Sequence, residues 1–155
     1  MRKILMKILL LAVVSLVGVA AQAQTVMPVF AEGKAGKHWV KGQFTVMNQG
    51  VQPLPVSVEP RQLQIVEGRG AFGMVQPGTE VELKDTSAVI APRSSRTFDF
   101  KIHCETDCMV TFLSGMVTGK TKDGVLVKLW LPSSVFLCTE VKGCRARIKK
   151  AAGLP

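Results

Sequence analysis

Tyrosine is absent from this 155-residue chain, and tryptophan occurs only twice, at Trp39 and Trp130. Proteins that bind sugars or single-stranded nucleic acid rely on aromatic side chains for stacking. The scarcity of such side chains argues against both classes of ligand. We therefore expect no nucleic acid partner, although the formal net charge of the chain is +9.

Groups suited to catalysis are also scarce. The two histidines are His38 and His103, and His103 directly precedes Cys104 in a stretch that alternates like a strand. Adjacent strand residues point to opposite faces, so these two side chains cannot form a nucleophilic pair. The serines lack the strand-turn-helix context of a nucleophile elbow, and Glu105 with Asp107 offers too few oxygens for calcium. We predict no enzyme activity, no cofactor and no metal site.

Sustained helical periodicity is missing from the chain after its N-terminus. Short alternating runs rich in Val, Thr, Phe and Ile are separated by Gly, Pro and Asn instead. We expect a glycine-rich loop at 68–78 and strands at 25–32, 38–48, 54–67 (one bent strand or a pair), 80–84, 96–104, 108–120 and 124–131, with a further extended piece after Pro132. This pattern predicts an all-β fold, an immunoglobulin-like antiparallel β-sandwich of about seven strands, with a small barrel as the alternative.

A long apolar run is present only at the N-terminus. Three cations precede "ILLLAVVSLVGVA", and Ala21-Gln22-Ala23 follows with a small-x-small pattern. We predict a signal peptide over 1–23 rather than a membrane anchor, because the run is short and lacks a polar stop. The rest would comprise one domain at 24–138 and a basic tail at 139–155, periplasmic or secreted, with no transmembrane span after cleavage. Within the tail, "RARIKKAA" is compatible with a short helix whose cationic face would meet acidic surfaces.

The four cysteines all lie in the last third of the chain. In an exported protein, Cys104, Cys108, Cys138 and Cys144 predict disulfides. Three connectivities are open, and the spacings match no common zinc module. We favour the local pairs Cys104–Cys108 and Cys138–Cys144, each of which closes a short loop.

The segment "GVLVKLWLPSS", residues 124–134, is strongly apolar yet carries Lys128 at its centre. Strand periodicity places its odd-numbered apolar residues on one face and Lys128 on the other. A buried central strand with the ammonium at the rim is the more common explanation, because long exposed apolar edges promote aggregation. The alternative is an edge strand that receives a partner.

Three segments resemble the N-terminal immunoglobulin-like domain of periplasmic pilus-assembly chaperones, the PapD-like family. "GQFTVMNQG" is similar to the second strand with its Asn-rich turn, and "VIAPRSSRTFDFKI" to a proline turn that leads into a strand. "VLVKLWLP" resembles the closing strand. The resemblance spans residues 26–138, and sperm-protein-like domains share the same fold.

This resemblance implies that the closing strand is an exposed edge that lends alternate apolar side chains to an incomplete pilin subunit. In the family a lysine of this strand clamps the C-terminal carboxylate of the subunit, and Lys128 matches it. The matching partner-binding positions are Val125, Val127, Lys128, Leu129 and Leu131.

The chain also departs from the family pattern. The first strand offers no arginine to share the carboxylate, so that Lys34 or Lys37 would have to substitute. The chain ends 23 residues after Pro132, where the family has a second domain, and the late cysteine pairs are not part of the family pattern.

Two functions are compatible with these features. The first is a secreted chaperone-like or assembly module that binds a protein partner, such as a pilin-like subunit, through an edge strand. The alternative is a non-enzymatic immunoglobulin-like structural or adhesion module of the cell envelope without donor-strand activity.

Overall fold

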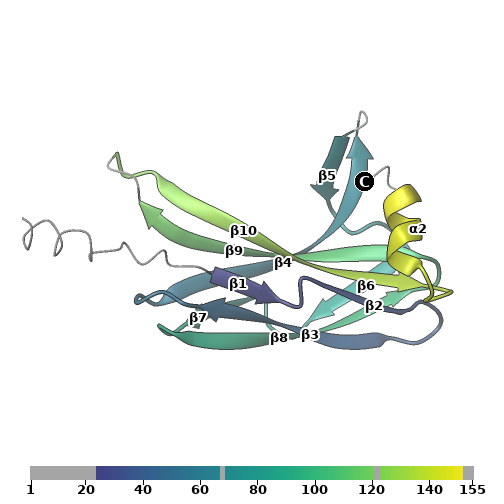
Figure 1. Cartoon of the computed structure of the whole chain (residues 1–155), viewed down its shortest axis with the longest axis horizontal. Helices are drawn as coiled ribbons and strands as arrows, with labels where there is room; N and C mark the ends of the chain where they lie inside the picture. The colour runs from purple at the N-terminus through teal and green to yellow at the C-terminus, as the bar shows by residue number, and fades with distance from the viewer. Residues whose placement is uncertain (1–23, 67–68, 121–122, 152–155) are drawn as a thin grey trace, which may run out of the picture.

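The structure is a computed structural model that describes residues 24–66, 69–120 and 123–151 (Figure 1). The predicted signal peptide at 1–23 lies outside the described residues. Along the chain the elements are β1 (Gln24–Met27), β2 (Phe30–Lys34), β3 (Val40–Asn48), β4 (Leu54–Val66), β5 (Arg69–Gly73), β6 (Thr79–Leu83), β7 (Ser87–Ile90), β8 (Ser94–Cys104), β9 (Cys108–Lys120), β10 (Leu126–Cys138) and α2 (Cys144–Ala151).

The strands form two sheets that pack face to face as a sandwich (Figure 1). Sheet A has the order β1-β3-β8-β6, and sheet B has the order β2-β10-β9-β4-β5, with β7 also paired with β4. The β2–β10 pair is parallel, and the other described pairs are antiparallel. The predicted all-β immunoglobulin-like sandwich is therefore confirmed, although the described residues form ten strands where about seven were expected, and one expected strand is divided between the two sheets.

The core lies between the sheets and follows the predicted alternation. Phe44 and Val46 of β3 are buried, as are Phe98, Phe100 and Ile102 of β8. Phe112 of β9 enters from sheet B, with its ring centroid 5.3 Å from that of Phe44. Each fully buried aromatic or aliphatic side chain contributes about 1.5–3 kcal/mol to folding, so this interlocked cluster holds the two sheets together.

The first predicted strand, at 25–32, is in fact two strands in different sheets. β1 pairs with β3 in sheet A, while β2 pairs with β10 in sheet B. The chain crosses between the sheets at Pro28, which follows a cis Met27–Pro28 peptide bond. Proline cannot donate to a ladder, so this residue separates the two pairings.

Two further sequence expectations are wrong in detail. Residues 69–73 are not loop, because β5 pairs with the second half of β4 and forms a two-stranded arm beside α2 (Figure 1). Pro132 does not end its strand either, since β10 continues from Leu126 to Cys138. The segment at 54–67, for which the sequence predicts one bent strand or a pair, forms the single long strand β4 up to Val66.

The C-terminal segment packs onto the sandwich through the predicted short helix. Cys144 and Ile148 of α2 lie against Met109, Phe136 and Cys138 on the outer face of sheet B. Disulfides join Cys104 to Cys108 and Cys138 to Cys144, which confirms the local pairing. The second bridge fixes the start of α2 to the end of β10.

Candidate functional site

The strand β10 has two halves with different surroundings. From Ser134 to Cys138 it lies between β9 and β2, with partners on both edges. From Leu126 to Leu131 it pairs with β9 on one edge, and no described strand pairs with its other edge. We call this second edge, over residues 126–131, the open edge. The segment at 124–131 is thus not a buried central strand.

The backbone geometry shows which residues present their polar groups to the open edge. The amide of Ser134 donates to the carbonyl of Val29 at 2.9 Å, on the β2 side. Backbone direction alternates along a strand, so Lys128 and Trp130 direct their N–H and C=O groups to the same side. The hydroxyl of Thr118 donates to the Val127 carbonyl at 3.4 Å, so the backbone carbonyl of Val127 points toward β9.

Pro132 lies at the boundary between the two halves. It has no N–H, and its backbone faces the same side as that of Ser134, which suits an edge position. The Ser133 hydroxyl donates to the Pro28 carbonyl at 2.7 Å, where the first segment enters sheet B. The open edge therefore ends where Pro28 and Val29 arrive.

The apolar side chains of the open edge are largely accessible to solvent. Val127 is 46% exposed and Leu129 is 36% exposed, whereas Leu131 is half-buried and packs against the core. Leu129 lies opposite the fully buried Met116 of β9, so it is on the inner face of the sheet. Val125, which precedes β10, is also exposed. The structure thus places the predicted apolar set along an accessible strand.

The outer face of the same segment carries Lys128 and Trp130. The Lys128 ammonium lies 4.1 Å from the centroid of the Trp130 ring, within cation–π distance. The indole in turn covers Gly115, where a Cβ atom would lie 2.6 Å from the ring. Gly115 and Trp130 form a fitted pair that sequence periodicity did not reveal, and Lys128 is held at the surface beside the open edge.

A second cation does not join Lys128. Lys34 lies opposite Cys138, at the far end of β10. Ten residues of extended strand separate it from Lys128, roughly 33 Å at 3.3 Å per residue. Lys37 follows three positions further on. The structure therefore does not bring Lys34 or Lys37 to Lys128, and the expected substitution for the missing arginine is wrong.

The open edge belongs to a hairpin with few neighbours. β9 pairs with β4 as far as Met116, opposite Val56. Beyond that point, β9 and β10 pair only with each other among the described residues. In Figure 1 this end of the hairpin, at the upper left, diverges from the strands below it.

Asp107 ties the loop between β8 and β9 to the C-terminal segment. Its carboxylate accepts from the Thr139 amide at 2.8 Å and from the Thr139 hydroxyl at 3.0 Å. Arg147 of α2 lies 3.6 Å away. The hydrogen bond from the Thr139 backbone, followed by the smaller effects of its hydroxyl and of Arg147, lowers the pKa of Asp107 below its usual value.

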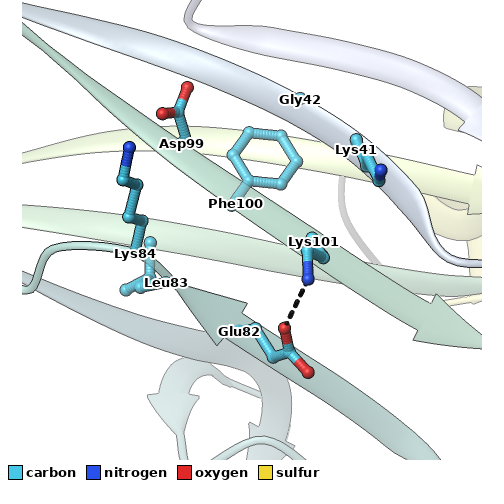
Figure 2. A pocket seen from close by; sticks show the side chains of 8 residues that line it. All are labelled: Lys41, Gly42, Glu82, Leu83, Lys84, Asp99, Phe100 and Lys101. Carbon is cyan, nitrogen blue, oxygen red and sulfur yellow. Dashed lines mark hydrogen bonds and ion pairs between the residues drawn. The ribbon is translucent and has the colours of Figure 1, made fainter.

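A hollow on sheet A carries several charged side chains. Figure 2 shows Lys41 of β3, Glu82 of β6 and Lys101 of β8 around it, with the Phe100 ring close to Gly42. Lys101 binds the Glu82 carboxylate at 3.0 Å.

Among the described residues, no group of three His, Cys, Asp or Glu side chains could hold a metal ion. The described part of the chain also contains no helix that could cross a membrane.

No protein-family model and no curated protein sequence matches this chain. Solved structures do match in fold. The class 5 fimbriae chaperone CfaA superposes with a TM-score of 0.57 at 9% identity, covering 76% of this chain and 57% of the chaperone. A structure of the Salmonella enterica SafA pilin in complex with the SafB chaperone gives 0.52 at 7% identity, with 79% and 57% covered.

The fold also matches a smaller protein, which is covered almost over its full length. WR4, a Caenorhabditis elegans member of the MSP family, superposes with a TM-score of 0.53 at 7% identity, covering 76% of this chain and 99% of WR4. None of these three is described as an enzyme. The chain spans little more than half the length of the matched chaperones. Its sandwich has the PapD-like immunoglobulin-like fold shared by pilus chaperones and MSP-domain proteins.

Proposed function

We propose that this protein is a chaperone-like or assembly module that binds an extended segment of a partner protein as an added strand on the open edge. One observation carries the proposal. The backbone groups of Lys128 and Trp130 point toward an edge with no described partner strand, next to exposed apolar side chains. A partner strand would pair those groups and cover Val127 and Leu129.

The energetic reason lies in the exposed surface. A long apolar edge strand is a template for pairing with another chain. Four apolar side chains at the start of β10 or just before it are each at least 36% exposed: Val125, Leu126, Val127 and Leu129. Covering them gains about 25 cal/mol per Å² of apolar surface, and the main-chain hydrogen bonds set the register of the partner.

The fold comparison supports the kind of partner. One matched structure holds a chaperone together with a pilin. We therefore propose a pilin-like extended segment as the partner and a periplasmic or secreted location. Val125, Val127, Leu129 and Leu131 would contact its apolar side chains, and Lys128 would offer a cation to a carboxylate at the edge. We propose no catalytic role for the chain.

A second candidate, a structural or adhesion module without donor-strand activity, also has an observation in its favour. Natural edge strands are protected from aggregation by lysine and proline. Lys128 and Pro132 occupy such positions on β10. In this case the edge would stay unpaired in the cell.

Site-specific photo-crosslinking in the native host distinguishes the two. A photoreactive phenylalanine at Val127 should capture one protein, and the captured peptide should be an extended segment with alternate apolar residues. Val89 of β7 provides a matched control, because it is an apolar residue with 71% exposure on another strand. Equal products at both positions, or none at Val127, would reject the edge-binding function.

A further inference from the structure

A second apolar surface lies on the outer face of sheet B, near the end of β10 opposite the open edge. We call it the outer groove. Its floor is formed by Met109 and Phe136, and its walls by β2, the β5 arm and α2. The lining residues are Val29, Phe30, Leu63, Phe72, Met109, Thr111, Pro132, Ser134, Phe136, Arg145 and Lys149.

Several of these side chains are exposed despite their apolar character. Val29 is 60% exposed, and Phe30 and Phe72 are close to half exposed on opposite walls. The volume of the groove is about 330 Å³, which is at the small end of the range of sites for small molecules. Solvent thus reaches a concave surface that would be more stable if covered.

The polar groups of the floor are already satisfied. The hydroxyls of Thr111 and Ser134 lie 2.9 Å apart and bond to each other. The Ser134 amide donates to the Val29 carbonyl on the β2 side, and the neighbouring residues of β10 pair with β9, so both edges of the strand are occupied here. A peptide laid along this floor would leave its own amides without partners, at a cost in free energy. An aliphatic chain has no such requirement.

Charge is confined to one side of the groove. Arg145 and Lys149 are one helical turn apart on α2 and are both half-buried, whereas none of the described residues that line the groove is acidic. The Arg145 guanidinium lies 3.9 Å from the centroid of the Phe30 ring. No carboxylate of the described residues forms an ion pair with Arg145. Its planar group is thus stacked in place, with donors suited to a carboxylate.

We propose that the outer groove binds a medium-chain aliphatic carboxylate. The alkyl chain lies between Phe30 and Phe72 over Met109 and Phe136, and the carboxylate meets Arg145. Charge complementarity selects the anionic head, and the satisfied floor selects an aliphatic body over a peptide. This site is independent of the open edge, because it uses the outer face and the paired half of β10.

The test is a calorimetric titration of the full chain with decanoate, below its micelle concentration, against decanol and decyltrimethylammonium. We expect one saturable site for decanoate and at least about tenfold weaker binding of the neutral and cationic ligands. Arg145→Gln should weaken decanoate binding by about tenfold. Lys150→Gln is the matched control on the same helix, since Lys150 does not line the groove.

A second measurement localises the ligand. In spectra of methyl-labelled methionine, decanoate should shift the Met109 signal and leave that of the core residue Met116 unchanged. Val127→Glu should bind decanoate normally, so that failure of the proposed edge function would leave this result intact. The proposal is overturned if decanol binds as tightly as decanoate, if Arg145→Gln has no effect, or if only anionic lipid vesicles bind.

Discussion

At the level of single residues, Val127 and Leu137 occupy the same face of β10 in different surroundings. Val127 is 46% exposed on the open edge, whereas Leu137 is fully buried in the core. A charge costs several kcal/mol when it is buried without a partner and little when it reaches water. The two positions therefore separate the binding role of the strand from its structural role.

Val127→Glu should leave the free energy of unfolding within about 1 kcal/mol of the wild type, while abolishing capture of the partner. Leu137→Glu should lower stability by more than about 4 kcal/mol, or prevent folding. Urea denaturation of both variants measures the difference. Equal destabilisation by the two changes would mean that the open edge is covered in the free protein.

Asp107 provides a test at the junction of the loop and the C-terminal segment. Its pKa is lower in the folded protein than in the unfolded chain, so its carboxylate stabilises the fold above the unfolded pKa of about 3.9. This contribution is lost as the pH falls through the lower folded pKa.

Asp107→Asn should therefore lower the melting temperature at pH 6, and the difference from the wild type should shrink below about pH 4. Thermal melts across this pH range measure the effect. Glu105→Gln is a suitable control in the same loop, because no described hydrogen bond or ion pair involves Glu105. A constant difference at all pH values would show that the carboxylate charge has no role.

At the level of elements, the alternation of backbone direction makes neighbouring positions of β10 unequal. The N–H of Lys128 faces the open edge, whereas that of Leu129 faces β9. Proline removes the N–H at either position. In the free protein only the Leu129 N–H faces a neighbouring strand, so only its loss affects the sheet.

Lys128→Pro should fold with a loss of stability below about 1 kcal/mol and should fail to bind the partner, because the added strand loses a hydrogen bond and meets the proline ring. Leu129→Pro should cost at least about 2 kcal/mol through the lost β9 contact. Binding and denaturation curves measure both effects. Lys128→Ala separates the backbone from the side chain, and the same loss of binding in both Lys128 variants would assign the effect to the ammonium.

The elements also show what the sequence could and could not predict. Alternation in β3 and β8 predicted their buried faces, because each strand has one face on the core and one in water. The division of residues 25–32 between two sheets was missed, since a proline between apolar residues does not specify partners. The sequence could not predict whether residues 124–131 form a central strand or an edge strand, because alternation indicates which face is buried and says nothing about the edges of a strand.

At the level of the whole molecule, the sandwich was predictable and the outer groove was not. The groove combines three distant parts of the sequence, which are β2, the β5 arm, and the end of β10 with the neighbouring α2. The segment "RARIKKAA" was compatible with a short helix, but the position of that helix depends on the Cys138–Cys144 bridge and on packing of Ile148. Charge counts alone could not place Arg145 above Phe30.

The pairing of the open edge also determines whether the whole molecule acts as a binding module. Residue-resolved hydrogen exchange of the main chain tests this most directly. In the free protein, the amides of Lys128 and Trp130 should exchange rapidly while those of Val127 and Leu129 are protected by β9. With the crosslinked partner bound, Lys128 and Trp130 should become protected as well. Protection of Lys128 and Trp130 already in the free protein, or no change on binding, would contradict the account.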